Sequence, residues 1–422
     1  MVGAKYLALS LVLRVRDCLG AVRETPLIPL LPVQALYASF DRFPSSKGAA
    51  VHINRFAPAL FDRVERGLLC VLGDATLPSY QREGSIQIAR FDEPISNFLE
   101  RTIAYGAWLA QILEHAAPAL SLCHFRDPWS GVAVVGRRGR SYRSVYEVNG
   151  LPSIELRPRF PDVDTQTWRK IEKLEQVCLE ASTEIITVSE AQARLLVDRG
   201  ISREKITVIP NGATCHAPQP RPSEAPSRYI VYVGALQRWQ GVEVLLRAFR
   251  LLRDLSDVKL VLCCSTRPRL AKGYHKLAEK LDISARVVWH YQLPREQLVA
   301  WLQHAELSVA PLTECERNTV QGCCPLKILE SMAAGVPVVA SDLPAVRELV
   351  TDRENGWLVR AERPEALARA LRVLLESAPE RARLGTRAQE TVLARFTWEQ
   401  ALRRLDAVYD RLLGSAVAMS HG

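Results

Sequence analysis

The run from Cys324 to Ser341, which reads CPLKILESMAAGVPVVAS, constrains the fold of this chain more than any other segment. Pro325 suits the first position of a helix, where its missing N–H is not needed, and Gly335 suits the position just beyond the helix end. Pro337 prevents the helix from continuing, so the apolar residues 336–340 are predicted to form a buried parallel strand. The run therefore predicts a short helix followed directly by a strand of an α/β domain.

The same short helix carries a cation and a carboxylate at its beginning. Lys327 and Glu330 lie three residues apart and therefore share one face of the first turn. Because the N-terminus of a helix favours anions, this end of the helix suits a phosphate. Glu330 is able to accept hydrogen bonds from sugar hydroxyls. The alternative is an ordinary helix–strand unit in which both side chains are solvated.

The composition excludes several classes of protein. Of the 422 residues, 48% are hydrophobic, and 22 glycines and 25 prolines are too few for a collagen-like or disordered chain. The net charge of +9 is modest for this length, and aromatic residues do not interleave with basic ones, which gives nucleic-acid binding little support. One compact basic turn is either a contact for anionic lipid headgroups or a solvated loop; it comprises Arg137, Arg138, Arg140 and Arg143.

Cysteine spacing and the N-terminal segment bear on the compartment. The ten cysteines include the adjacent pairs Cys263–Cys264 and Cys323–Cys324 but no Cys-x-x-Cys, so we expect small apolar side chains in a reducing compartment and no zinc site. The apolar stretch Tyr6 to Val15 has about half the length of a membrane span and predicts either an interfacial helix or an extension without function. We therefore expect a cytoplasmic protein, free or peripheral at the inner face of the cell membrane.

Strands alternate with helices in both halves of the chain, which predicts an α/β protein with two doubly wound parallel-sheet domains. In such a protein the functional cleft lies between the domains, at the carboxyl ends of the strands. The predicted parts are an extension at 1–30, an N-terminal domain at 31–212, a proline-rich linker at 213–228, a C-terminal domain at 229–394, and a helix at 395–422 that packs back on the N-terminal domain.

Four motifs occur in one order along the chain: Ile209-Pro210-Asn211-Gly212, Tyr232-Val233-Gly234, Trp239-Gln240-Gly241-Val242-Glu243, and the run from Pro325 to Ser341. Together they resemble the retaining GT-B glycosyltransferases of family 4, over roughly Leu36 to Leu413. The resemblance implies two Rossmann-like domains, the first for the acceptor and the second for the donor. It also implies transfer of a sugar from a nucleotide-diphosphate sugar to a hydroxyl acceptor with retention of configuration, with no metal and no cofactor. The products would be exopolysaccharide, lipopolysaccharide or glycolipid.

The resemblance also assigns roles to residues of the second domain. Glu330 would hold the ribose of the nucleotide, Lys327 would face the donor phosphates, and Gly234 would open the turn where the pyrophosphate lies. Arg238 is the candidate for a second phosphate cation. The full set of donor-binding candidates is Gly234, Trp239, Pro325, Leu326, Lys327 and Glu330.

In the first domain the turn Lys47-Gly48-Ala49 resembles a loop that contacts donor phosphate and acceptor. One strand ends at His124, Arg126 and Asp127, and another ends at Asn149 and Gly150, so both are expected to face the cleft. For His124, a satisfied histidine of the core is the alternative. The catalytic candidates are Lys327, Arg238, Asn149 and His124.

Three departures from the family pattern qualify these roles. Gly322 stands where many members carry a glutamate that contacts the donor sugar, which leaves Glu314 and Glu316 as possible sources of that contact. Gln240 stands where a lysine is usual, and Asn149 where a histidine is usual. Asp162-Val163-Asp164 is the only Asp-x-Asp and would be needed for a metal-dependent enzyme of another fold. Its position ahead of a helix favours an N-cap at Asp164 or Thr165 instead.

Two other functions remain open at this point. One is a catalytically silent partner of a membrane polysaccharide complex, and the other is a nucleotide-sugar epimerase. The predicted binding partners are a nucleotide-sugar donor, a carbohydrate or lipid-linked acceptor, and an anionic membrane surface. The motifs do not define the base, the sugar or the acceptor, because these depend on the shape of the pocket.

Overall fold

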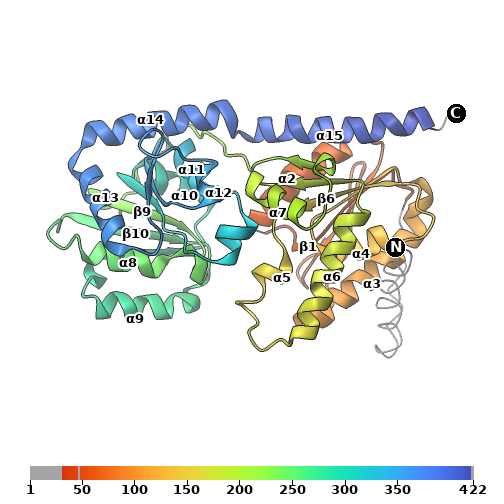
Figure 1. Ribbon diagram of the computed structural model, residues 1–422, viewed down its shortest axis with the longest axis horizontal. Helices are drawn as coiled ribbons and strands as arrows, with labels where there is room; N and C mark the ends of the chain where they lie inside the picture. The colour runs from red at the N-terminus through yellow and green to blue at the C-terminus, as the bar shows by residue number, and fades with distance from the viewer. Residues whose placement is uncertain (1–30, 46–47, 420–422) are drawn as a thin grey trace. The chain divides into compact units, whose positions relative to one another are not determined.

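The computed structural model describes residues 31–45 and 48–419. The chain forms two compact units, each built around its own sheet (Figure 1). Of the described residues, the first unit comprises 31–45, 48–188, 193–209 and 402–419, and the second comprises 189–192 and 210–401. The predicted extension at 1–30 and Lys47 lie outside the described residues.

The sheet of the first unit is parallel except at one edge. Its strands follow the order β3-β4-β2-β1-β5-β6-β7-β8, in which β3 alone runs antiparallel to its neighbour. The strands are β1 (Ala35–Arg42), β2 (Gly67–Leu72), β3 (Tyr80–Glu83), β4 (Ile86–Phe91), β5 (Leu122–Phe125), β6 (Arg143–Val148), β7 (Glu184–Thr187) and β8 (Ile206–Val208).

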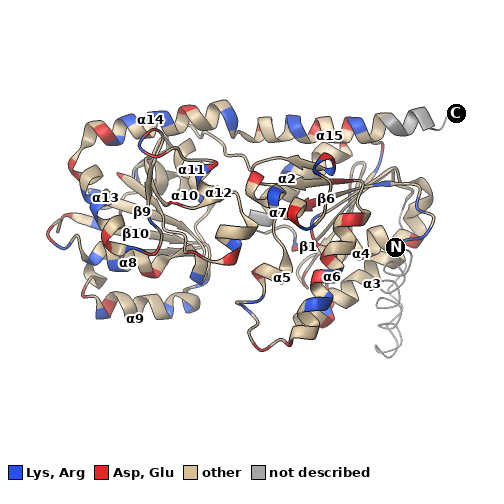
Figure 2. Cartoon of the chain, in the orientation of Figure 1, with Lys and Arg blue, Asp and Glu red and all other residues tan. Residues whose placement is uncertain are grey.

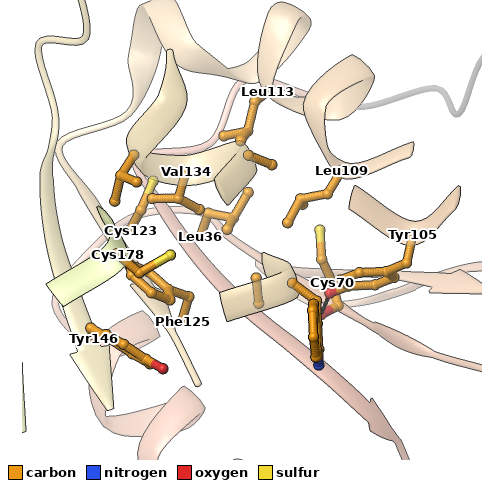
Figure 3. Close-up of a cluster of buried hydrophobic side chains, with 14 of the residues drawn as sticks. Leu36, Cys70, Tyr105, Leu109, Leu113, Cys123, Phe125, Val134, Tyr146 and Cys178 are labelled. Atoms are coloured by element: carbon orange, nitrogen blue, oxygen red, sulfur yellow. Dashed lines mark hydrogen bonds between the residues drawn. The ribbon is translucent and has the colours of Figure 1, made fainter. Parts of the chain in front are cut away.

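Helices cover both faces of this sheet. They are α2 (Gly48–Phe61), α3 (Phe98–Ala116), α4 (Pro128–Gly136), α5 (Pro152–Glu155), α6 (Thr165–Ala181), α7 (Glu190–Asp198) and α15 (Trp398–Met419). Figure 3 shows the core on one face, where Leu109 and Leu113 of α3 and Val134 of α4 meet Leu36 and Phe125 of the sheet. The opposite face carries the alternate side chains of the same strands, as period-two geometry requires.

The second unit has a six-stranded, entirely parallel sheet in the order β11-β10-β9-β12-β13-β14. Its strands are β9 (Arg228–Gly234), β10 (Val258–Cys264), β11 (Val287–Tyr291), β12 (Leu307–Ala310), β13 (Val338–Ser341) and β14 (Trp357–Val359). Its helices are α8 (Val242–Arg250), α9 (Lys272–Lys280), α10 (Arg295–Gln303), α11 (Leu326–Ala333), α12 (Pro344–Arg347), α13 (Pro364–Glu376) and α14 (Ala378–Arg395).

Buried residues divide between the two faces of this second sheet. Ile230 and Tyr232 belong to a core with α8 and α13, whereas Tyr229 and Val231 pack with Trp301 of α10. On the outer side of α14, basic and acidic residues alternate (Figure 2), and Arg383 pairs with Glu380. Such a pattern is typical of a solvent-exposed helix face.

Four elements were not predicted: strand β3, helix α4 and the four-residue helices α5 and α12. Strand β3 is short and polar, so it lacks the apolar alternation that marks a strand. Helix α4 begins at Pro128 and consists largely of small apolar residues, which give no clear amphipathic period. Strand β3 and helix α4 are therefore recognisable from the structure and not from their sequence patterns.

The proline-rich segment and most of the C-terminal helix belong to different units. The proline-rich segment runs as irregular chain and groups with the second unit. Helix α15 groups with the first unit from Leu402 onward, where Arg63 pairs with Asp406 and Asp410 and Arg411 pairs with Glu184.

No helix within the described ranges combines the length and the apolar character that crossing a membrane requires. The nine cysteines in the same part of the chain carry free thiols, and both adjacent pairs are buried. Burial raises the pKa of Cys264 to about 12, so this thiol is neutral and behaves as a small apolar side chain.

Candidate functional site

Helix α11 has the ends that its sequence predicts, with a shift of one residue at its start. Pro325 is the N-cap, just before the first helical residue Leu326, rather than the first helical residue itself. At the other end the N–H of Gly335 donates to Met332 O at 3.0 Å and the N–H of Val336 donates to Ser331 O at 3.1 Å. These two bonds form a Schellman motif and confirm Gly335 as the residue just beyond the helix.

Lys327 reaches from α11 to the end of β9. Its Nζ donates to the hydroxyl of Tyr232 at 3.1 Å and to Oε1 of Gln240 at 2.5 Å, and lies 4.2 Å from the centre of the Tyr232 ring. A Cβ on Gly234 would come within 2.9 Å of this Nζ. The structure therefore brings together Lys327, Gly234 and Gln240, which come from three separate motifs.

The charge of Lys327 is poorly compensated. Neither Tyr232 nor Gln240 carries a negative charge at neutral pH. Burial, and then the positive charge of Arg317, lower the pKa of Lys327 to about 7. A buried ammonium with neutral partners gains free energy when an anion arrives, which is the electrostatic requirement for a phosphate site.

Arg317 is a residue that the sequence reasoning missed. Its guanidinium lies 5.8 Å from the centre of the Trp239 ring, and Nδ2 of the next residue, Asn318, donates to the Trp239 carbonyl at 3.2 Å. The predicted second cation, Arg238, is exposed. The positive charge of Arg317, and not that of Arg238, is among the causes that lower the pKa of Lys327. The only sequence signal for Arg317 is its place in the segment before Pro325.

Glu330 lies one turn after Lys327 and is half-buried. Its side chain is 22% exposed, and Oε1 pairs with NH1 of Arg295 at 3.3 Å. Burial raises the pKa of Glu330, and the charge of Arg295 opposes this rise. Both side chains line a small pocket together with His216 and Leu298, all within the second unit. The carboxylate is thus oriented by one arginine and open to a ligand.

At Gly322, the backbone has no room for the glutamate of other family members. Its φ is +79°, and a Cβ would come within 2.9 Å of Ser189 Oγ in the same unit. Glu314 and Glu316, the proposed replacements, are both exposed on the chain before it. Any side chain at position 322 would therefore be both strained and crowded.

In the first unit, His124 lies in the core and not at the surface. It is 0% exposed, its ring stacks on Tyr37 at 4.5 Å, and Tyr409 of α15 donates to its Nδ1 at 2.8 Å. Its Nε2 is 3.0 Å from Oε2 of Glu147. Since both nitrogens have partners and burial lowers the pKa of His124, the geometry agrees with the alternative of a satisfied core histidine.

Glu147, which the sequence reasoning did not single out, is the centre of this network. Its carboxylate accepts from the Tyr37 hydroxyl at 2.8 Å, from Nε of Arg126 at 3.1 Å and from Nδ2 of Asn149 at 2.7 Å. His52 of α2 lies 3.0 Å from it as well. Burial alone would raise the pKa of Glu147, but Arg126 and the hydrogen bonds hold it well below its usual range. The carboxylate is therefore ionised.

The remaining candidates have clear local positions. Asp127 is the N-cap of α4 and accepts from the N–H of Ser130 at 2.8 Å, and burial raises its pKa to about 6. Asp164 is the N-cap of α6, where it accepts from the N–H of Thr167 at 2.9 Å, which confirms the predicted cap. Gly48 and Ala49 begin α2. Among the described residues no group of three or more His, Cys, Asp or Glu is arranged to hold a metal ion.

The two sheets of parallel strands with their helices define a protein of the doubly wound α/β class. Residues 46–217 match the family described as Glycosyltransferase Family 4, and residues 217–391 match Glycosyl transferases group 1. The chain is therefore a member of the group 1, family 4 glycosyltransferases and has the GT-B fold.

Relatives of known activity share part of the sequence. The MMP alpha-(1->4)-mannosyltransferase of Mycolicibacterium hassiacum is 31% identical over 60% of this chain and 59% of its own length. The D-inositol 3-phosphate glycosyltransferase of Corynebacterium diphtheriae is 34% identical over 46% of this chain and 45% of its own. The matches thus cover about half the length of these relatives.

Solved structures share the fold at lower identity. Sucrose-phosphate synthase of Thermosynechococcus elongatus superposes with a TM-score of 0.75 at 19% identity, over 90% of this chain and 100% of that one. HepE of Anabaena in complex with UDP-glucose superposes with a TM-score of 0.69 at the same identity and coverage.

Proposed function

We propose that this chain is a retaining glycosyltransferase that moves a hexose from a nucleotide-diphosphate sugar to a hydroxyl acceptor, with neither a metal ion nor a cofactor. The acceptor is a carbohydrate or a lipid-linked carbohydrate of polysaccharide or glycolipid synthesis, at the cytoplasmic side of the cell membrane. The observation that carries the proposal is the ammonium of Lys327, held over Gly234 by neutral partners at the start of α11.

The chemistry agrees with this assignment. When the bond between sugar and phosphate breaks, negative charge develops on the departing nucleotide diphosphate, and fixed donors at that point stabilise the transition state. Lys327, the N-terminus of α11 and the nearby charge of Arg317 supply such stabilisation. Glu330, one turn along, is placed to accept from the ribose hydroxyls. A structural neighbour holds UDP-glucose, which makes UDP the first nucleotide to try.

A second candidate function is favoured by one observation. Because Gly322 excludes a side chain at the place of the usual glutamate, the protein could bind the nucleotide and not transfer the sugar, as a silent partner of a polysaccharide complex. Thermal-shift screening of nucleoside diphosphates and their sugars identifies the ligand, since a specific binder stabilises the native state. Release of UDP from UDP-glucose by the purified chain would exclude the silent partner, and product NMR would report retention.

Replacing Glu330 by glutamine should weaken UDP binding at least tenfold, about 1.4 kcal/mol, because the acceptor for the ribose hydroxyls loses its negative charge and one of its two oxygens. The affinity for 2′,3′-dideoxy-UDP should change little, since that nucleotide lacks the hydroxyls. Calorimetric titration of UDP and of 2′,3′-dideoxy-UDP into the unchanged protein and into the Glu330→Gln variant measures how much of the loss depends on the ribose hydroxyls. Glu279→Gln, on the exposed side of α9, is the matched control. An equal loss of affinity for the two nucleotides would show that Glu330 does not bind the ribose hydroxyls.

The affinity for UDP should fall as the pH rises above about 7. The pKa of Lys327 in the free protein is about 7, so above that pH the amine is mostly neutral and must take up a proton when the diphosphate binds. The dissociation constant should then rise up to about tenfold per pH unit between about pH 7 and pH 9, where the phosphate is already ionised. Lys327→Arg, which keeps its charge, should show a flat profile in the same titration. Parallel pH profiles for the unchanged protein and the Lys327→Arg variant would contradict the assignment of Lys327 to the phosphate site.

A further inference from the structure

Residues 209–213, here called the crossing segment, carry the chain from the first unit into the second. The N–H of Ala213 donates to Phe396 O at 2.8 Å, shortly before the chain returns to the first unit. A Cβ on Gly212 would come within 2.5 Å of the backbone nitrogen of Trp398. The crossing segment is therefore packed closely against the returning chain within the second unit.

Asn211 connects the crossing segment to the start of helix α11. This residue is 7% exposed, and its Nδ2 donates to the carbonyl oxygen of Cys324 at 2.8 Å. The backbone of Asn211 also hydrogen-bonds the Cys324 thiol, which opposes the rise in the pKa of that thiol caused by burial. Cys324 directly precedes Pro325, the N-cap of α11. Two contacts thus join the crossing segment to the place where α11 begins.

The carbonyl of Cys324 needs a donor from outside the helix. The N–H groups of Ile328 and Leu329 both donate to the carbonyl of Pro325 instead. A buried carbonyl without a donor is unfavourable, because it has lost its hydrogen bonds to water. The Oδ1 of Asn211, in contrast, is buried without a hydrogen-bond partner in the described part of the chain. An asparagine that leaves one polar atom unpaired is a poor choice for stability alone, which indicates a further role for its amide.

The position of Cys324 bears directly on the anion site. Lys327 lies three residues later, in the first turn of α11, and its Nζ lies 3.1 Å from the Tyr232 hydroxyl. The later part of the helix is held independently, because Ser331 Oγ lies 2.6 Å from Ser308 Oγ of β12. A displacement of about 1 Å costs up to about 10²-fold in the function of a positioned group. The contact at Cys324 therefore controls whether the ammonium stays where an anion needs it.

We propose that Asn211 is a positioning residue of the anion site. Through the Cys324 carbonyl it holds the first turn of α11, and with it the ammonium of Lys327, over Gly234. It acts through Lys327 and not by contact with the ligand. The importance of Lys327 for nucleotide binding rests on the proposed function, whereas the effect of Asn211 on Lys327 does not.

Calorimetric titration with UDP tests this role. Asn211→Ala and Asn211→Ser, whose side chains are too short to reach the carbonyl, should each weaken UDP binding about tenfold, the usual worth of one hydrogen bond. In a protein that already carries Lys327→Met, Asn211→Ala should change the affinity less than about threefold, because both substitutions act on the same ammonium. An equal loss with and without Lys327 would overturn the proposal, since a merely structural role does not depend on the ammonium.

Asn355→Ala is the matched control. Asn355 is 4% exposed in the same unit, and its Nδ2 likewise donates to a backbone carbonyl, that of Leu349, at 3.2 Å. Both Asn355→Ala and Asn211→Ala should lower the midpoint of urea denaturation, because each removes the donor from a buried carbonyl. UDP binding should weaken in Asn211→Ala and stay unchanged in Asn355→Ala. A similar loss of affinity in the two variants would contradict a specific role for Asn211.

The pKa of Lys327 in the ligand-free protein separates this proposal from the proposed function. It is measured from the pH dependence of the ¹³Cε signal in lysine-labelled protein, where the signal missing from Lys327→Met identifies the residue. Burial is the largest cause of the lowered pKa, so a loosened first turn in Asn211→Ala should raise the pKa toward the ordinary value of lysine. Asn355→Ala should leave the pKa of Lys327 unchanged.

The two measurements fail independently. An unchanged Lys327 pKa in Asn211→Ala would overturn the positioning role. Absence of binding by any nucleoside diphosphate would instead refute the transferase function, while the pKa of Lys327 would still decide the role of Asn211.

Discussion

Replacement of Lys327 by methionine is expected to reduce sugar transfer about 10²- to 10³-fold, the usual effect of removing one preorganised donor from a developing negative charge. Methionine keeps an apolar stem against the Tyr232 ring and removes only the ammonium, which lies 3.1 Å from the Tyr232 hydroxyl. The turnover number and the Michaelis constant are measured with UDP-glucose as the donor. Most of the loss should appear in turnover, because the charge on the leaving group grows as the bond breaks.

Lys280→Met is the control for this experiment. Lys280 is exposed at the end of α9 in the same unit, so its loss changes the net charge equally and should leave transfer unchanged. The Lys327 variant should also fold, since it no longer buries an amine whose pKa is lowered by burial. Turnover within about threefold of the unchanged protein, less than 1 kcal/mol, would remove Lys327 from the phosphate site.

Replacement of Gly241 by alanine is expected to destabilise the second unit by about 2–5 kcal/mol. Gly241 has a φ of +72°, where a Cβ costs about 1–2 kcal/mol. That Cβ would also come within 1.6 Å of the carbonyl oxygen of Pro311, and relieving such a contact by backbone movement costs about 1–3 kcal/mol more. Urea denaturation measures the loss. The turn at Gln240, which accepts from Lys327, should move with it and weaken UDP binding.

Gly335→Ala provides a close comparison in the same unit. Gly335 has nearly the same φ, +71°, but the nearest atom to its Cβ would be Nε2 of Gln389 at an ordinary 3.8 Å. Only the conformational cost of about 1–2 kcal/mol should therefore appear. Equal losses at Gly241 and Gly335 would show that the close approach to Pro311 relaxes without cost.

The features that could be predicted from the sequence are those that depend on interactions between residues close together in the chain. Pro325, Gly335 and Pro337 determine the ends of a helix and the start of a strand through bonds that span at most five residues. The shared helix face of Lys327 and Glu330 follows from helical geometry alone. These local rules gave the two parallel sheets and the cation and carboxylate of α11.

The partners of these residues were not predictable in the same way. Lys327 meets Tyr232, 95 positions earlier, and Glu147 meets Tyr37, 110 positions earlier. Such pairings arise when strands take neighbouring places in a sheet, and a sequence pattern of period 2 or 3.6 does not contain that order. For this reason Arg317 and Glu147 were not predicted as site residues, although Glu147 lies in strand β6 and Arg317 lies shortly before the motif that begins at Pro325.

The sequence by itself therefore determined the class of fold, the order of the elements and the two ionisable residues at the start of α11. The tertiary structure alone decided which polar residues face a ligand and which are enclosed. His124, a catalytic candidate from its place at the end of a strand, lies in the core, whereas Glu330 is partly exposed and open to a ligand. The physical reason is that burial and pairing set the charge and the reach of a side chain, and both depend on residues distant in the chain.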